Sequence, residues 1–331
     1  MKAVLVRGFA PFEEARVEEV PDPEPGPGDV IVDVVAAEAN YPDILVIEGR
    51  YQVKPPLPFS PGKAAAGRVA ALGPGVTGLR LGDRVSLQVE YGAYAEKVRV
   101  RAEHCYAMPD SMSFDVAAAL GLVYQTAHFA LLDRAGFRPG DVVLVLGAAG
   151  GVGMASVQLA KALGARLVIG AAGSAKAAVA EAVGAEAVID ASGADLRERM
   201  REEVARLTDG HGADIVIDPV GGALTTAALR ALAWRGRLVV VGFASGEIPD
   251  IRANYLLVKN IGVMGLQWSD YRDRAPAQVA AAQREIFDLH LVGKLDPHIG
   301  RKLPLEAFRE ALALLRDRKA EGKIVIEVRP S

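Results

Sequence analysis

The chain has 331 residues, which is too long for a single hydrophobic core of ordinary size, so we expect two domains. Apolar residues make up 51% and charged residues 24%, with both signs spread along the chain, as in folded globular proteins without a disordered tail. The net charge is only -3 and basic residues alternate with acidic ones. Nucleic acid is therefore not an expected partner.

The apolar runs are too short to cross a membrane. Runs such as 142–146 have the length of strands, and glycine or charge ends them well short of a bilayer span. Residues 1–7 carry a charge and a short apolar run, but no long apolar region or cleavage site follows, so we expect a first strand there. The single cysteine, Cys105, can form no internal disulfide, which agrees with the cytoplasmic location that we expect.

Up to about residue 113 the pattern is one of short β-type segments separated by turn residues. The expected strands are 3–6, 29–36, 67–72, 83–87 and 93–98. Proline and glycine are concentrated in two loops, 21–28 and 55–62. This pattern is typical of an antiparallel, barrel-like domain with long functional loops.

From Asp141 the pattern changes to strands that alternate with alanine-rich helices, which indicates a parallel sheet covered on both faces. The expected strands are 142–146, 166–170, 187–189, 215–218, 237–241 and 261–265, and the expected helices are 154–163, 175–183, 196–207 and 223–234. Six such strands are what a doubly wound dinucleotide-binding domain needs. Two helices, 277–287 and 305–317, and a strand at 323–328 complete the chain and could return to the first domain.

A glycine-rich loop, 145–153, lies between a predicted strand and a predicted helix. Gly150 has no side chain where the backbone would touch a pyrophosphate, and Gly153 lies where helix and strand would meet. The first glycine of the usual fingerprint is Ala148 here. A tight turn without a ligand is the alternative, but the four further strand units favour a dinucleotide site.

The residues around this loop resemble a known family. Gly140-Asp141, Leu144, Ala148 to Gly151, Gly153, Gln158 and Lys161 keep the spacing of the signature of quinone oxidoreductases and ζ-crystallins, which are zinc-free medium-chain dehydrogenases/reductases. The resemblance continues at 61–62, 82–85, 126–127, 218–222 and 242–246, so it spans nearly the whole chain.

The resemblance implies an α/β protein in which a doubly wound Rossmann domain, 125–266, is inserted in a mainly antiparallel, barrel-like (GroES-like) catalytic domain made of 1–124 and 267–331. In that family the active site lies in the cleft between the two domains. The resemblance also implies a homodimer, with the strand at 261–265 extending the sheet across a two-fold axis.

The end of the second strand of the dinucleotide domain predicts the cofactor. No acidic residue is present there to bind a ribose 2′-hydroxyl, whereas Ser174 and Lys176 suit a 2′-phosphate and therefore NADPH. A solvated helix face is the alternative for Lys176. The resemblance adds Arg318 as a phosphate ligand; the family's tyrosine after the third strand is Ala191, so Lys323 is a further candidate. The other expected cofactor-binding residues are Tyr124, Thr126, Ala149, Gly150, Gly151, Val152, Gly170, Gly242 and Phe243.

The positions that hold zinc in other members of the superfamily carry unsuitable residues. Asn40 takes the place of a cysteine, and Lys63 lies where a histidine is expected; neither an amide nor an ammonium suits Zn²⁺. One cysteine cannot form the four-cysteine structural site, and the five histidines show no ligand spacing. We expect no metal, and hence no alcohol oxidation through a metal alkoxide.

Without a metal, the expected reaction is hydride transfer from NADPH to a quinone. The alternative acceptor is an activated alkene of the 2-enoyl or haloacrylate type, and a third possibility is a non-catalytic NADPH-binding protein.

Candidate residues for holding the acceptor lie between 40 and 63: Asn40, Tyr41, Asp43, Tyr51 and Lys63. Tyr51 matches a family tyrosine that faces the substrate, and a phenol can stack on a ring and donate a hydrogen bond. Asn40 could hold the nicotinamide or a product oxygen, and Lys63 could stabilise an enolate or quinol anion. A loop cap, half-buried packing and a surface charge are the respective alternatives for Asn40, Tyr51 and Lys63. The family's other tyrosine is Leu45 here.

Overall fold

The computed structural model describes residues 1–193 and 195–329. The chain forms two compact units. The β unit contains Met1–Leu122, Ser269–Asp288 and Pro297–Ser331, and the α/β unit contains Val123–Trp268 and Leu289–Asp296. The boundaries expected from the sequence, 124/125 and 266/267, differ from these by two residues, and the sequence did not predict that 289–296 would belong to the second unit.

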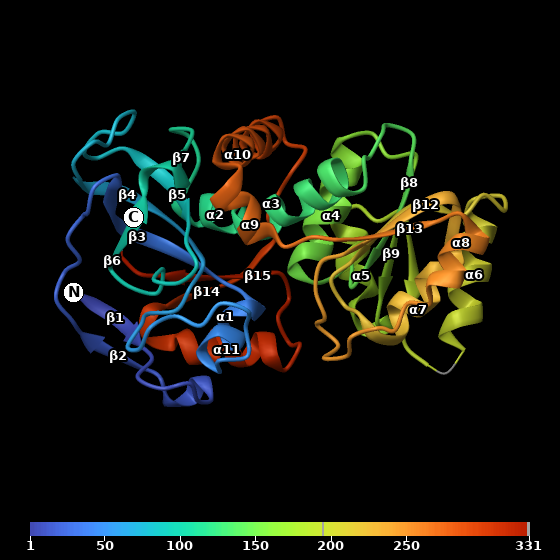
Figure 1. Cartoon of the computed structure of the whole chain (residues 1–331), viewed down its shortest axis with the longest axis horizontal. Helices are drawn as coiled ribbons and strands as arrows, with labels where there is room; N and C mark the ends of the chain where they lie inside the picture. The colour runs from blue at the N-terminus through green and yellow to red at the C-terminus, as the bar shows by residue number, and fades with distance from the viewer. Residues whose placement is uncertain (194, 330–331) are drawn as a thin grey trace. The chain divides into compact units, whose positions relative to one another are not determined.

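A seven-stranded sheet forms the centre of the β unit (Figure 1). Its order is β14 (Ile299–Pro304), β15 (Lys323–Glu327), β3 (Asp29–Ala39), β4 (Ala64–Leu72), β5 (Arg84–Gln88) and β7 (Cys105–Ala107), with β6 (Lys97–Arg101) also paired to β3. All neighbours are antiparallel except β14 and β15. β1 (Lys2–Leu5) and β2 (Arg16–Glu19) form a separate ribbon. The mainly antiparallel sheet of the prediction is confirmed.

Helices complete the β unit. They are α1 (Tyr41–Ile47), α2 (Phe114–Ala119), α9 (Trp268–Arg274), α10 (Pro276–Leu291), α11 (Phe308–Arg316) and the 3₁₀ turns η1 (Phe12–Glu14), η2 (Ala102–His104) and η5 (Leu305–Ala307). Two of these helices, α9 and α10, each have one end in the residues of the α/β unit. The sequence did not predict α1, in which Asn40 is the N-cap and Pro42 lies in the first turn, where its missing N–H costs nothing.

The α/β unit contains a six-stranded parallel sheet in the order β10 (Ala187–Asp190), β9 (Leu167–Ala172), β8 (Val142–Leu146), β11 (Ala213–Asp218), β12 (Leu232–Val240) and β13 (Gly262–Gly265). The helical segments are α3 (Leu122–Phe129), η3 (Ala130–Arg134), α4 (Gly151–Ala162), η4 (Ser174–Lys176), α5 (Ala177–Ala182), α6 (Leu196–Leu207), α7 (Gly222–Ala231) and α8 (Ala253–Lys259). This strand order is the doubly wound one, and the predicted Rossmann topology is confirmed.

The expected helix 223–234 is too long. α7 ends at Ala231, and β12 begins at Leu232 because this residue pairs with Ala213 of β11. Arg235 then adopts a left-handed φ of 64°, at the place where the register between β11 and β12 shifts. Alanine-rich sequence continues across this junction, so helical periodicity did not reveal it.

Residues 114–134 form a helical run that is long and apolar enough to cross a membrane. However, 78% of its most apolar window is buried within the protein, as in core helices of soluble folds.

Candidate functional site

The glycine loop connects β8 to α4 through a turn that only small residues can form. Gly147 has a φ of 62°, and Gly150 is the N-cap of α4. A Cβ on Gly153 would lie 2.0 Å from the Gly147 carbonyl oxygen, so the helix can approach the strand only with glycine at this position. The N–H groups at the start of α4 remain available for a phosphate, and the loop fits a dinucleotide.

Ala148 replaces the first glycine of the fingerprint because the neighbouring strand makes room for it. Ala148 is fully buried, and a Cβ on Gly170 of β9 would lie 2.9 Å from the Ala148 methyl carbon. Gly170, predicted to bind cofactor, therefore has a packing role beneath the loop.

The ends of β9 and β10 lie side by side and carry polar residues. Asp190 of β10 pairs with Ala172 of β9, two residues before Ser174. Asp190 accepts hydrogen bonds from the Ser192 N–H at 2.9 Å and hydroxyl at 2.6 Å, and these bonds lower its pKa, so its carboxylate is charged at neutral pH. At this edge of the sheet the sequence predicted Ser174 and Lys176 but not Asp190.

The turns after β11 and β12 are held together. The buried carboxylate of Asp218 accepts from the N–H groups of Val220 and Gly221, both at 2.9 Å, and from the Thr225 hydroxyl. The Val241 N–H donates to the Asp218 carbonyl at 2.8 Å. Gly242 and Phe243 thus lie at the carboxyl ends of the parallel strands, where such sheets bind ligands.

Tyr124 and Thr126, expected near the nicotinamide, are buried in α3. The Tyr124 hydroxyl donates to Gln158 Oε1 at 2.7 Å, and Gln158 Nε2 donates to the Asp296 carbonyl at 2.7 Å. These bonds explain why 289–296 belongs to the α/β unit.

In the β unit, Asn40 belongs to a buried charged group. Lys323 of β15 forms an ion pair with Glu38 of β3 at 2.5 Å and donates to Asn40 Oδ1 at 3.2 Å. Asn40 Nδ2 donates to Glu38 Oε2 at 3.0 Å. Both polar atoms of the Asn40 side chain are thus engaged inside the unit. The same contacts argue against Lys323 as a ligand of the 2′-phosphate. If Lys323 moved to the phosphate, the buried carboxylate of Glu38 would have no cation beside it.

Asp43 is a second buried acid next to this group. It accepts from the Asn40 N–H and from the Tyr94 hydroxyl, both at 2.8 Å. Burial raises the pKa of Asp43 from 3.8 to about 6. The folded protein therefore holds this proton more tightly than the unfolded chain does.

We expect Asp43 to make the protein less stable as the pH rises from about 4 to 7, because ionisation of a buried acid opposes folding. In Asp43→Asn this dependence should disappear, a change of up to about 3 kcal/mol in the free energy of unfolding between the two ends of the range. Urea unfolding at several pH values measures it. If the free energy of unfolding changed with pH in the same way in both proteins, Asp43 would have an ordinary pKa in the folded state.

Lys63 and Tyr51 form a pair. The Lys63 ammonium lies 4.4 Å from the centroid of the Tyr51 ring, a cation–π distance. Lys63 is only 3% exposed, so it is not a surface charge. It forms an ion pair with Glu90 and also donates to the Glu90 carbonyl at 3.2 Å.

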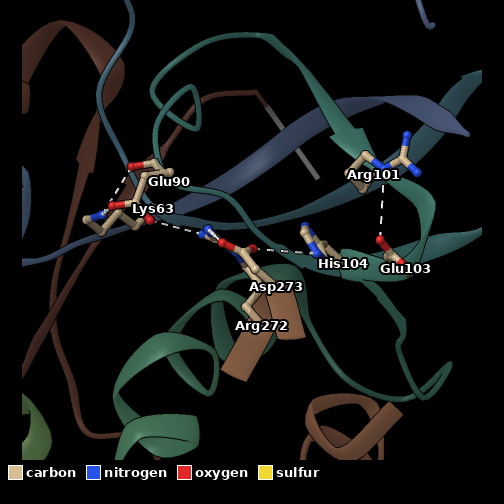
Figure 2. Close-up of polar contacts among 7 residues, drawn as sticks. All are labelled: Lys63, Glu90, Arg101, Glu103, His104, Arg272 and Asp273. Atoms are coloured by element: carbon tan, nitrogen blue, oxygen red, sulfur yellow. Dashed lines mark hydrogen bonds and ion pairs between the residues drawn. The ribbon is translucent and has the colours of Figure 1, made fainter. Parts of the chain in front are cut away.

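A series of charged residues continues from Lys63 through Glu90 (Figure 2). Arg272 of α9 donates to Glu90 Oε2 at 3.2 Å and binds Asp273 through two nitrogens, at 2.7 and 3.0 Å. His104 Nε2 lies 3.9 Å from Asp273. Glu90 and Arg272 were not predicted from the sequence, since they lie 182 positions apart and belong to no motif.

Among the described residues no group of three or more histidine, cysteine, aspartate or glutamate side chains could hold a metal ion. At the two positions that bind zinc elsewhere, Asn40 and Lys63 are engaged with carboxylates.

Comparison with known proteins shows the family to which the chain belongs. Residues 26–110 match the family described as alcohol dehydrogenase GroES-like domain, and residues 151–284 match that described as zinc-binding dehydrogenase. A quinone oxidoreductase-like protein 2 homolog of Nematostella vectensis is 39% identical over 306 residues, which cover 92% of this chain and 83% of that protein.

Two solved structures extend the similarity to the whole fold. A mycobacterial protein solved in complex with NADPH has a TM-score of 0.91 at 31% identity and covers 99% of this chain and 100% of its own. The Escherichia coli quinone oxidoreductase complexed with NADPH has a TM-score of 0.89 at 29% identity, with the same coverage. Fold and site thus define an oxidoreductase of the medium-chain dehydrogenase/reductase class. Within that class, the chain belongs to the quinone oxidoreductase family.

Proposed function

We propose that this protein is a cytoplasmic, metal-independent enzyme that reduces a quinone with NADPH. NADPH supplies the hydride from C4 of its nicotinamide. The observation that carries the proposal is the contact between the half-buried Tyr51 ring and the buried ammonium of Lys63, which takes the position of a zinc ligand in zinc enzymes of the superfamily. A phenol that can stack on the acceptor and an ammonium beside it offer a hydrogen bond and a positive charge to an oxygen that becomes negative.

An enone or other activated alkene is the second candidate acceptor, and the same pair favours it. Its reduction gives an enolate, whose localised charge benefits more from a positioned cation than a delocalised quinol anion does. Steady-state oxidation of NADPH with a quinone, an α,β-unsaturated ketone and an α,β-unsaturated acid separates the candidates. Activity that survives treatment with a chelator would support metal independence. If no acceptor promotes NADPH oxidation, the protein is a non-catalytic NADPH-binding protein.

The cofactor residues proposed in the α/β unit are those of the glycine loop (Ala149, Gly150, Gly151 and Val152), Ser174 and Lys176 after β9, Gly242 and Phe243 after β12, and Tyr124 and Thr126 in α3. Arg318, at a left-handed φ of 57° beyond α11, stays a prediction as a phosphate ligand.

Lys176→Glu should raise the KM for NADPH far more than that for NADH, because a carboxylate repels the 2′-phosphate and can accept the ribose hydroxyl. The expected loss for NADPH is about one to three kcal/mol, the scale of one charge-assisted hydrogen bond. Steady-state kinetics with each cofactor measures the two KM values, with Lys161→Glu on α4 as the matched control. Equal effects on the two cofactors would show that Lys176 does not bind the 2′-phosphate.

We further propose a homodimer formed through β13. Within the described chain β13 pairs only with β12, which leaves its outer edge open. Large apolar side chains are exposed nearby: Trp234 at 72%, Leu257 at 79% and Val258 at 73%. The Arg235 N–H donates to the Asn260 carbonyl at 3.0 Å, which brings Trp234 close to the end of α8. A second copy would cover this surface and pair the open edge.

Light scattering at micromolar concentration should therefore give twice the mass of the chain, and Leu257→Asp should shift it toward the monomer because a charge cannot be buried there unpaired. Asp209→Asn, on the loop after α6, is the control that should stay dimeric. A monomeric wild-type protein would overturn the proposal.

A further inference from the structure

Glu90 binds two cations at once. One carboxylate oxygen pairs with the Lys63 ammonium, and the other accepts from Arg272 at 3.2 Å. All three side chains are nearly buried, with 4% of Lys63, 12% of Glu90 and 7% of Arg272 exposed. A carboxylate held on both sides in this way has little freedom to rotate, and neither cation is left without a counter-charge.

Arg272 is fixed in turn by its neighbour. Asp273 accepts from both Nε and Nη2 of the guanidinium, the two-point geometry that orients an arginine most strongly. The order of contacts is therefore Asp273, Arg272, Glu90, Lys63, as Figure 2 shows. The ring of Tyr51 lies under the ammonium.

We propose that Glu90 is a positioning residue that holds the Lys63 ammonium over Tyr51, and that Arg272 keeps Glu90 in place. This inference rests on the proposed function, in which Lys63 and Tyr51 stabilise the anion formed from the acceptor. Neither Glu90 nor Arg272 needs to touch the acceptor. Lys63 acts in its charged form and transfers no proton, so its ionisation state limits activity at high pH.

The charged groups around Lys63 act on its ionisation in opposite directions. Burial lowers the pKa of Lys63, the carboxylates of Glu90 and Asp43 raise it, and the guanidinium of Arg272 lowers it. Loss of Glu90 should therefore lower the pKa of Lys63 further, whereas loss of Arg272 should raise it. If the two residues had only a structural role, their loss would not be expected to shift the pKa of Lys63 in opposite directions.

The test is the pH profile of kcat/KM for enone reduction, measured in the wild type, Glu90→Gln, Glu90→Asp and Arg272→Gln. We expect the fall in activity at high pH to move to lower pH in Glu90→Gln and to higher pH in Arg272→Gln. Glu90→Asp keeps the charge and should lie between Glu90→Gln and the wild type. At neutral pH Glu90→Gln should lose about tenfold in kcat, while its KM for NADPH stays unchanged. Arg274→Gln, on the same helix α9 with an exposed side chain, is the matched control and should leave the profile where it is.

A second measurement does not depend on turnover. The ¹³Cε resonance of Lys63, assigned by its loss in Lys63→Met, reports the ionisation of the amine directly. Its titration should move in the same two directions in Glu90→Gln and Arg272→Gln. Shifts in one common direction, or none in either variant, would overturn the proposal. If the resonance behaves as expected but no acceptor is reduced, the proposed function fails while the positioning of Lys63 stands.

Discussion

Tyr51→Phe should slow enone reduction by about ten- to a hundredfold, the range for one lost hydrogen-bond donor at a developing oxyanion. Phenylalanine keeps the ring, and with it the surface on which the acceptor would stack and over which Lys63 lies at 4.4 Å. NADPH binding should therefore be unchanged. For a quinone the loss should be smaller, because the quinol anion is delocalised over an aromatic ring and water can protonate it.

Tyr51→Ala is the control for packing. Tyr51 is half-buried against the core of the β unit, so removal of the ring should disturb the site itself and slow both reactions. Steady-state rates with both acceptors, together with nicotinamide fluorescence for cofactor affinity, separate the two effects. If Tyr51→Phe reduces both acceptors at the wild-type rate while Tyr51→Ala does not, the hydroxyl has no catalytic role and the residue only forms a wall.

Lys323→Met should cost about 3–5 kcal/mol in the free energy of unfolding at neutral pH. The substitution removes the cation from Glu38, a fully buried carboxylate, and leaves Asn40 as its remaining polar contact. Burial already raises the pKa of Glu38, and the ion pair with Lys323 opposes that effect. Without Lys323 the carboxyl group should bind a proton more readily, so the cost should shrink as the pH falls.

Urea unfolding at pH 5 and pH 8 measures this cost. The double variant Glu38→Gln, Lys323→Met should recover most of the lost stability, because it buries no uncompensated charge. Lys319→Met, an exposed residue just before β15, should change little. A double variant as unstable as the single one would show that the loss comes from packing. If Lys323 instead bound the 2′-phosphate, the folded double variant would lose affinity for NADPH and keep it for NADH.

Much of the α/β unit could be predicted from the sequence because its signals are local. The apolar run of β8 and the glycines that follow it reflect backbone constraints that act within a few residues. The predicted strand, glycine loop and helix are all confirmed by the fold. Gly153, for example, is required by a carbonyl oxygen only six positions earlier. Asp190 was not singled out from the sequence, because polar residues were sought only after the second strand, whereas Asp190 ends the third.

The charged contacts of the β unit could not be predicted in the same way. Lys323 and Glu38 are brought together by the pairing of β15 with β3, in which Val325 lies opposite Glu38. Arg272 reaches Glu90 from a helix that the sequence analysis did not predict. One signal was available: a glutamate in the apolar strand β3 has to find a partner if the strand is buried.

The ion pair between Glu38 and Lys323 also bears on how the protein is made. The two residues are separated by 285 positions (323 minus 38), so at 5–20 residues per second a ribosome takes about 15–60 s to travel from one codon to the other. Throughout that time Glu38 lacks its cation and β3 lacks β15, although its other partners in the sheet, β4 and β6, are synthesised soon after it. Most of the α/β unit, by contrast, is one continuous stretch, Val123–Trp268, which is synthesised completely before Lys323 is added. We therefore expect this later-encoded unit to be the first to reach its native form, because the sheet of the β unit is complete on the far side of β3 only after β15 is added.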